Sequence, residues 1–184
     1  MHGKTLAVLR AATRDGELPI VCDASSCTEG LRHTIESDTS DKPLTIIDSV
    51  DFALAHVLPT LPDYTKLASL ALHPTCSSTR LGMNNSLKTV AQSVAERVEI
   101  SENVGCCAFA GDRGMLHPEL TASATRAEAA DVASMGATAH ASCNRTCELG
   151  MTRATGQPYR HVLELLEELT TPHVSVSTAQ VIKR

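Results

Sequence analysis

The segment "LASLALHPTCSSTRLGMNNSLKTVAQSVAERVEI" (residues 67–100) decides the fold class. It contains an apolar run at 67–72, a longer amphipathic stretch at 86–98 and a second apolar run at 98–100. The order of a buried strand, a helix and another strand is typical of a parallel sheet with crossover helices. The helix is predicted because apolar residues recur at helical spacing, namely at Leu87, Val90, Ala91, Val94 and Ala95.

The same alternation extends in both directions from this segment. Apolar runs at 18–21 and 44–47, and a weaker one at 137–142, predict further strands, whereas the patterns at 118–134 and 159–170 predict helices. We therefore predict an α/β fold with a largely parallel sheet, flanking helices, two pseudo-repeated halves and cysteines at the carboxyl ends of strands. The tail, 171–184, has weak signals and is predicted to be either a last strand or a frayed end.

Composition narrows the class of protein. The 184 residues are 42% hydrophobic and 20% charged, which is ordinary for a soluble globular protein. Two Tyr, two Phe, no Trp and a net charge of −5 offer neither stacking surfaces nor a basic field, so we expect no nucleic-acid partner. No apolar run reaches the roughly 20 residues of a membrane span, and the first residues do not resemble a secretory signal. We therefore expect a cytoplasmic protein without a transmembrane segment.

The seven cysteines are placed where ligands bind in such folds. Most follow a predicted strand or open a predicted helix, and the carboxyl edge of a parallel sheet is the usual ligand-binding edge. In a reducing compartment, clustered cysteines bind metal or carry out redox chemistry more often than they form structural disulfides. The sequence thus predicts a thiol-rich site at this edge.

An internal repeat divides the chain. "IVCDASSCTEGLRHT" (20–34) resembles "HASCNRTCELGMTRA" (140–154), although Cys22 and Cys27 are separated by one more residue than Cys143 and Cys147. We predict a truncated first repeat over 1–62, a complete cysteine-rich repeat over 63–170, and the tail at 171–184.

The cysteine spacing and the words around it resemble a known family. A lone Cys76 is followed by the adjacent pair Cys106–Cys107 and then by the closing pair Cys143-x3-Cys147, within "HPTCSSTRLG", "GCCAFAGDRGMLHPELTASA" and "NRTCELGMTRATGQPYRHVLELLEE". This pattern resembles the C-terminal cysteine-rich "CCG" (heterodisulfide-reductase-like) iron–sulfur domain of FAD-linked D-lactate dehydrogenases and of glycolate oxidase iron–sulfur subunits.

The resemblance implies a function in electron transfer. It implies a [4Fe–4S]-type cluster, cubane or non-cubane, and a chain that is part of an oxidoreductase without catalytic residues of its own. FAD would sit in a partner domain or subunit outside this sequence, and electrons would pass on to a quinone or cytochrome acceptor, peripherally at the inner face of a membrane. Five positions match the thiolate ligands of the family, namely Cys76, Cys106, Cys107, Cys143 and Cys147.

Three departures from the family pattern keep alternatives open. Ala108 replaces the glycine of "CCG", which adds about 1–2 kcal/mol of strain if that position needs a positive φ. The closing pair has three intervening residues where the family has two, and the first repeat keeps only Cys22 and Cys27. The main alternative is a degenerate interaction or assembly domain that binds no metal.

Other chemistry remains possible for the same thiols. The pair Cys143/Cys147 can be a redox dithiol, a zinc ion can replace the cluster, and the adjacent pair Cys106–Cys107 can form a vicinal disulfide when metal is absent. His73, in "HPTC", either donates a hydrogen bond to a cluster sulfur or has a purely structural role.

Overall fold

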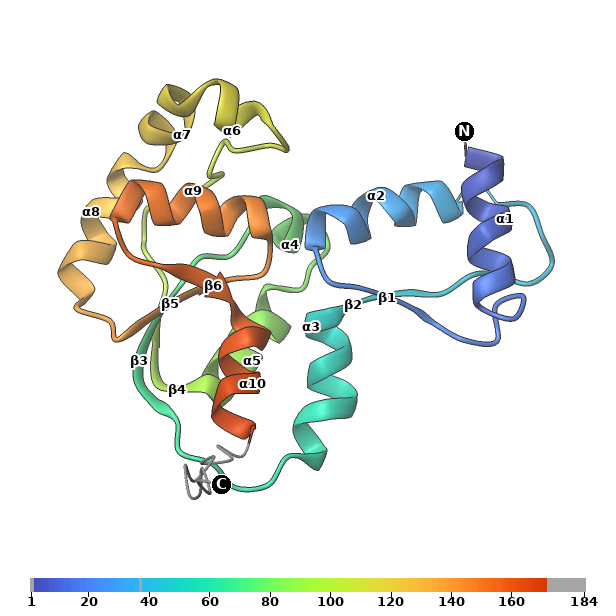
Figure 1. Ribbon diagram of the computed structural model, residues 1–184, viewed down its shortest axis with the longest axis horizontal. Coiled ribbons are helices and arrows are strands. Elements are labelled where there is room, and N and C mark those ends of the chain that lie inside the picture. The colour runs from blue at the N-terminus through green and yellow to red at the C-terminus, as the bar shows by residue number, and fades with distance from the viewer. Residues whose placement is uncertain (1, 37, 172–184) are drawn as a thin grey trace, which may run out of the picture.

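The computed structural model describes residues 2–36 and 38–171, and within them the strands form two parallel sheets (Figure 1). The larger sheet has the order β4 (Ala95–Glu99), β3 (Leu67–Leu72), β5 (Ala139–Ser142) and β6 (Tyr159–His161), and the smaller sheet pairs β1 (Ile20–Cys22) with β2 (Ile46–Asp48). Every strand pair is parallel, with Leu70 opposite Val98 on one side and Ala139 on the other. The predicted α/β fold with a parallel sheet and flanking helices is confirmed.

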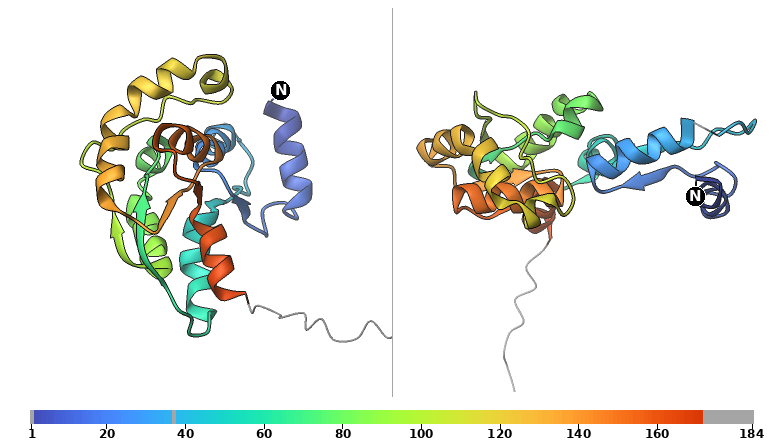
Figure 2. Two further views of the ribbon diagram at one scale, coloured as in Figure 1. Left: turned by 60° about the vertical axis from the view of Figure 1, so that its left-hand side comes forward. Right: turned by 90° about the horizontal axis from the view of Figure 1, so that it is seen from above.

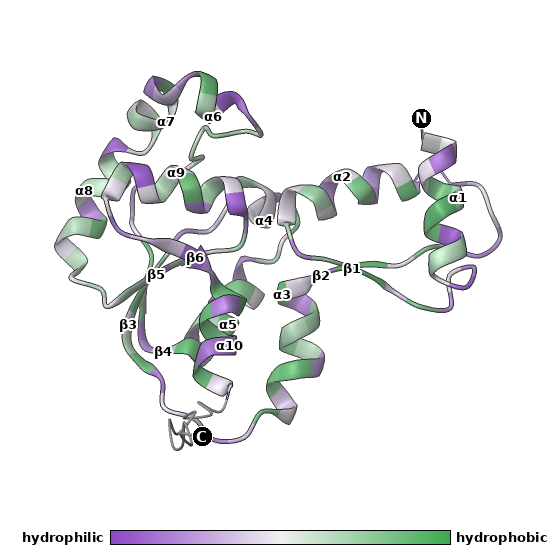
Figure 3. Ribbon diagram, viewed as in Figure 1, coloured by the Kyte–Doolittle hydropathy of each residue, from purple (hydrophilic) through white to green (hydrophobic). Residues whose placement is uncertain are grey.

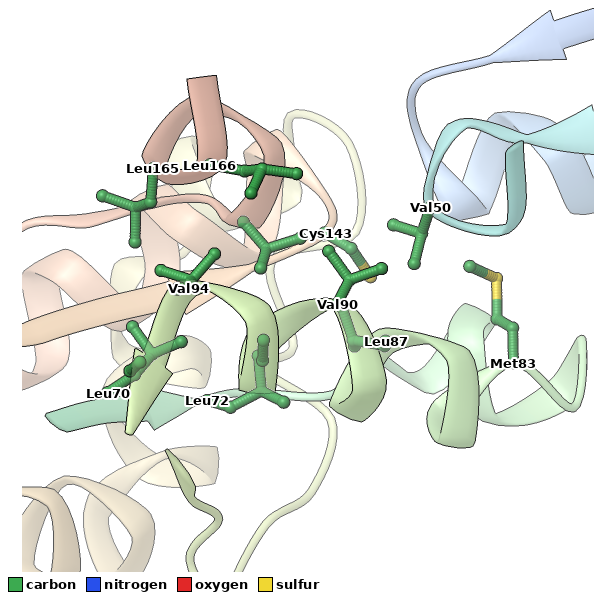
Figure 4. Close-up of a cluster of buried hydrophobic side chains, with 14 residues drawn as sticks. Val50, Leu70, Leu72, Met83, Leu87, Val90, Val94, Cys143, Leu165 and Leu166 are labelled. Atoms are coloured by element: carbon green, nitrogen blue, oxygen red, sulfur yellow. The ribbon is translucent and has the colours of Figure 1, made fainter. Parts of the chain in front are cut away.

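Helices cover both faces of the larger sheet. On one face, α5 (Asn84–Val94) and α10 (Val162–Thr170) pack on the strands and enclose the main apolar core (Figure 4). On the other face lies α9 (Arg145–Thr155), with α8 (Arg126–Met135) beside it, as the two views of Figure 2 show. Because side chains alternate along a strand, Leu70 and Leu72 enter the core, whereas Ala71 and then His73 lie toward the opposite face.

The first half of the chain joins this core through one helix. The helix α3 (Ser49–Phe52), continued by a π turn at Ala53–Val57 and a 3-10 turn at Leu58–Thr60, places Val50 among the buried side chains next to α5. Apolar residues colour much of α3 and of β3 in Figure 3. The helix α2 (Ser25–Glu36) contacts the short α4 (Cys76–Arg80), and α1 (His2–Ala12) packs against α2.

The internal repeat is visible in the order of elements. The series β1–α2–β2–α3 in the first half corresponds to β5–α9–β6–α10 in the second. The second strand of each copy ends in a helix cap, because Asp48 accepts a hydrogen bond from the Val50 amide and His161 accepts one from the Leu163 amide. Both copies therefore use the same strand–helix–strand–helix unit.

The strand register changes how the cysteines of the two copies correspond. Cys22 lies opposite Asp48, and Ser142 lies opposite His161. Since Asp48 and His161 hold equivalent cap positions, the structural counterpart of Cys22 is Ser142. Counting from there, Cys27 in α2 corresponds to Cys147 in α9, which explains the extra residue between the first two cysteines.

Several element boundaries differ from the sequence-based prediction. The helix predicted over 86–98 ends at Val94, because Ala95–Glu99 pairs with β3 as β4. The helix predicted over 118–134 is broken at Thr125 into α7 (Pro118–Ala124) and α8. Residues 159–161, predicted to begin a helix, form the edge strand β6, and α1 and the short α6 (Arg113–Leu116) were not predicted. The predicted tail lies outside the described residues except for Thr171.

The cap residue His161 makes stability depend on pH with a definite sign. Burial lowers the pKa of His161 below its ordinary 6.5, while the nearby carboxylates of Asp48 and Glu164 act in the opposite direction. The unfolded chain therefore binds more protons than the folded protein, so this contribution is complete above about pH 6.5 and is lost as the pH falls toward the folded pKa. We expect His161→Asn, which keeps a capping acceptor, to lose less stability between about pH 7 and pH 5 than the parent chain.

Urea unfolding at pH 7 and pH 5 measures how much stability the variant and the parent chain each lose. His140, whose pKa burial also lowers, is present in both chains and cancels in the comparison. Identical pH slopes for variant and parent would show that His161 is not held neutral by the fold.

Within the described residues, every helix is too short or too polar to span a lipid bilayer.

Candidate metal centre

Three buried side chains meet at one point beyond the larger sheet. A ring nitrogen of His73 and the sulfurs of Cys107 and Cys147 all lie within 4.8 Å of one another. The two sulfurs are 2.9 Å apart, and Cys107 and Cys147 are only 3% and 4% exposed. Imidazole nitrogen and thiolate sulfur are the donors that iron, zinc and copper prefer, so this group is a candidate transition-metal site.

The parallel sheet brings these residues together from distant parts of the chain. His73 directly follows β3, Cys107 lies in the loop after β4, and Cys147 lies in the first turn of α9, shortly after β5. The carboxyl ends of adjacent parallel strands meet at the same edge of a sheet. The predicted placement of cysteines at that edge is confirmed.

A carboxylate fixes the orientation of the histidine. Nδ1 of His73 lies 2.7 Å from Oε1 of Glu128 in α8, and both side chains are buried. The other ring nitrogen, Nε2, is buried without an ordinary hydrogen-bond partner among the described residues. A histidine held through one nitrogen by a carboxylate, with the other nitrogen turned to a group of thiols, has the arrangement typical of a metal ligand.

The pKa shifts within this group favour the thiolate form of one cysteine, Cys107. The hydrogen bond between the Cys107 and Cys147 thiols, together with the His73 side chain, lowers the pKa of Cys107 to about 5 against the effect of burial. The same hydrogen bond raises the pKa of Cys147, and burial acts in the same direction. Burial acts to lower the pKa of His73, but its Cys107 and Glu128 neighbours raise it to about 9. These opposite shifts favour a Cys107 thiolate beside a protonated His73 ring.

A second pair of cysteines lies at the solvent side of this group. Cys76, the first residue of α4, and the exposed Cys106 both line a surface cleft of about 580 Å³ between α4, α5 and the loop after β4. The pKa of Cys76 is raised by burial and by the neighbouring Cys106 thiol, so the two side chains interact. The cleft gives solvent and small molecules access to this outer pair.

Cys143 lies in the apolar core and is not part of the group formed by His73, Cys107 and Cys147. Its side chain is fully buried in the main core, between Val90 and Val50 in Figure 4, and its sulfur lies 3.9 Å from the hydroxyls of Ser25 and Thr75. Burial raises the pKa of this thiol to about 11. Cys143 follows Ala141 by two residues and so shares its core-facing side, whereas Cys147 is on the helix that covers the opposite face. The set of five cysteine ligands stays a prediction; the structure brings Cys107 and Cys147 together with His73, and Cys76 beside Cys106.

The loop that carries the adjacent cysteines is anchored by Phe109. This ring is fully buried and forms a small apolar cluster with Cys107 and Cys147. Gly114 and Gly150 pack against it so closely that a Cβ on either would lie within 3.3 Å of the ring. The guanidinium of Arg153 lies 5.4 Å from the ring centre. The loop is thus held by an aromatic side chain, and this fixes the position of the Cys107 sulfur.

Ala108 adopts a left-handed backbone with φ of 53°. A side chain in this conformation costs about 1–2 kcal/mol relative to glycine. We expect Ala108→Gly to raise the free energy of unfolding by about 0.5–1 kcal/mol, because the relief of strain exceeds the entropic cost of glycine. Ala122→Gly, at an exposed position of α7, is the matched control and should lower stability by about 0.5–1 kcal/mol. Chemical denaturation measures both, and a loss of stability in Ala108→Gly would contradict the strain.

Sequence reasoning anticipated only part of this site. The sequence predicts at most a hydrogen bond from His73 to a cluster sulfur. Only the fold shows that His73 lies together with Cys107 and Cys147. Glu128 and Phe109 were not anticipated, because a lone glutamate in an alanine-rich helix and a lone phenylalanine in a loop carry no local signal of such a role.

No protein-family model matches this chain, and no curated protein matches it significantly. The fold and the site therefore define the class by themselves: an α/β protein with parallel sheets and a buried histidine–cysteine group suited to a transition metal.

Proposed function

We propose that this chain is an iron–sulfur electron-transfer module of a FAD-linked dehydrogenase acting on D-lactate or a related 2-hydroxy acid. FAD would be bound by a partner domain or subunit, and a quinone or cytochrome would accept the electrons. The observation that supports this proposal is the meeting of Cys107, Cys147 and His73 within 4.8 Å, with Cys76 and Cys106 beside them. The cysteine spacing of the resembling family supports the same cofactor.

The donor set fits an iron–sulfur group. Such clusters are bound by cysteine thiolates, and the surroundings of Cys107 lower the pKa of its thiol, which favours that form. Cys107 and Cys147 would bind from the buried side, and Cys76 and Cys106 from the side of the cleft. When bound, the cluster supplies one-electron transfer. The chain itself excludes water on the buried side and sets the local charge through His73 and Glu128, which tunes the potential of such centres.

A mononuclear metal ion is the second candidate, and the position of His73 favours it. Tetrahedral zinc takes cysteine and histidine at about 2.3 and 2.0–2.1 Å, which places two bound sulfurs about 3.8 Å apart. The sulfurs of Cys107 and Cys147, at 2.9 Å, need to separate by only about 1 Å to reach that geometry. In this case His73 is a direct ligand, and the chain holds a redox-inactive ion in place of a redox centre.

Anaerobic reconstitution separates the candidates. The full chain is incubated with iron and sulfide in one sample and with zinc in another, and bound iron, sulfide and zinc are quantified together with the visible absorption and electron paramagnetic resonance spectra. Bound iron and sulfide with a reducible chromophore supports the iron–sulfur module. Stoichiometric zinc with no stable iron supports the mononuclear site. A folded, colourless protein that binds neither, with an unchanged melting temperature, would support the metal-free assembly domain instead.

Glu128→Gln tests the part played by the carboxylate. Glutamine keeps the shape and one acceptor oxygen but removes the charge that holds the His73 ring, so we expect a fall of about 10–100-fold in metal affinity. Glu119→Gln, on the exposed α7, is the control and should leave metal affinity unchanged. Competition with a chromophoric chelator measures both affinities. Equal affinities for the two variants would remove Glu128 from the site.

A further inference from the structure

The buried pair of thiols has a geometry that suits a reaction without metal. Cys107 Sγ and Cys147 Sγ are 2.9 Å apart, nearer than the ~3.8 Å that a tetrahedral metal imposes on two bound sulfurs. A disulfide bond is about 2.05 Å long, so the sulfurs need to approach by less than about 1 Å. They belong to different elements, the loop after β4 and the helix α9, so a bond would join two parts of the site that are distant in the sequence.

We propose that Cys107 and Cys147 form a reversible disulfide in the metal-free protein, with a hydroperoxide as the oxidant. One sulfur attacks the peroxide, the O–O bond breaks, and a sulfenic acid and one water result. The second thiol then attacks the sulfenic sulfur, the S–S bond forms, and the hydroxyl leaves as a second water. Two thiols and one hydrogen peroxide thus give one disulfide and two waters, with both thiol protons ending in water. A small dithiol reverses the step by exchange.

Other pairings of the site cysteines are less well placed for this reaction. In the adjacent pair, Cys106 is exposed and Cys107 buried, and the sulfur of Cys106 accepts a hydrogen bond from the Ala108 amide at 3.4 Å. The sulfur of Cys143 lies among hydroxyl groups within the core. The 2.9 Å approach of the two sulfurs therefore favours a bond between Cys107 and Cys147 over the two sequence-based hypotheses, the vicinal disulfide and the Cys143/Cys147 dithiol.

Disulfide formation and metal binding would exclude each other in this protein. A disulfide between Cys107 and Cys147 uses the two thiols that the candidate metal centre needs, so an oxidised chain cannot take up metal until it is reduced. The inference does not rest on the proposed function, because it concerns the thiols of the metal-free chain whichever metal they bind.

The test uses the full chain, stripped of metal with a chelator and treated with one equivalent of hydrogen peroxide. We expect the seven free thiols of the chain to fall by two, to five, with a mass loss of about 2 Da. Non-reducing peptide mapping should show one link, between the peptides of Cys107 and Cys147, which dithiothreitol removes. Cys107→Ser and Cys147→Ser should not form it. Cys27→Ser, which changes the exposed counterpart of Cys147 in the first repeat, should form it as the parent does.

Three results would overturn the inference. They are a link between Cys106 and Cys107, a link between Cys76 and Cys106, and oxidation to sulfinic acid without any link. Metal binding is measured separately on the reduced chain, so the two claims fail independently. A chain that binds metal but never forms the disulfide refutes this inference alone, and a chain that forms the disulfide but binds no metal refutes the proposed function alone.

Discussion

Cys107→Ser is expected to remove most of the bound metal, lowering metal affinity by more than about 100-fold. The reason is that Cys107 contributes the thiolate at the centre of the donor group, and loss even of an outer partner commonly costs 10–100-fold. Serine has nearly the same size, and its hydroxyl is a much poorer ligand for soft metals. Bound metal after reconstitution and gel filtration, together with chelator competition, measures the effect. Cys147→Ser should show a loss of the same order.

Two further variants make this result decisive. Cys27→Ser, at the equivalent position of the first repeat, should bind metal as the parent chain does. Cys143→Ser distinguishes the two ligand sets, because the family resemblance includes Cys143 and the structure places its sulfur in the core. Full metal binding by a folded Cys143→Ser would favour the structural group. Loss of metal from a Cys143→Ser chain whose circular dichroism and melting temperature match those of the parent apoprotein would favour the five-cysteine set.

Gly114→Ala is expected to lower the free energy of unfolding by about 2–3 kcal/mol, at the upper end of overpacking effects. A Cβ at this position would lie 2.5 Å from Cδ2 and Cγ of Phe109 and 2.9 Å from its Cα. The ring is fully buried and its backbone belongs to the same loop, so neither can move away without displacing Cys107. We therefore also expect weaker metal binding in this variant. Urea unfolding of the apoprotein and chelator competition measure the two effects.

Gly105→Ala provides the control in the same loop. The nearest atom to its added Cβ would be the Asn103 carbonyl oxygen at 4.0 Å, which is ordinary contact, so the change in stability should stay within about 0.5 kcal/mol. If both variants proved equally stable, the close packing of Phe109 against Gly114 would be wrong.

The fold class could be predicted because short apolar runs alternate with helix-forming sequence along the chain. The strand at 67–72 was predicted with its observed bounds, since a buried central strand is a continuous apolar run. The edge strand β6 was missed. Its three residues, "YRH", directly precede the helix α10, and only pairing with β5 makes them a strand. Local patterns carry little information about such short edge elements.

The sequence could predict only the part of the candidate site that depends on where the strands end. The edge of the sheet at which Cys107 and Cys147 meet follows from the rule that parallel strands end together. The face on which each thiol lies does not follow from spacing alone. The alternation along β5 and its continuation place Cys143 in the core, whereas the turn into α9 carries Cys147 to the other side of the sheet.

The sequence by itself determined the parallel α/β architecture, the repeat and the edge of the sheet where thiols collect, because these depend on local periodicity and on composition. The tertiary structure decided the membership of the donor group, the pairing of Cys107 with Cys147, and the support of His73 by Glu128 and of the cysteine loop by Phe109. The contacts of Cys107 with Cys147 and of His73 with Glu128 join residues 40 and 55 positions apart, and a contact of that kind exists only after the strands have aligned and the helices have packed on them.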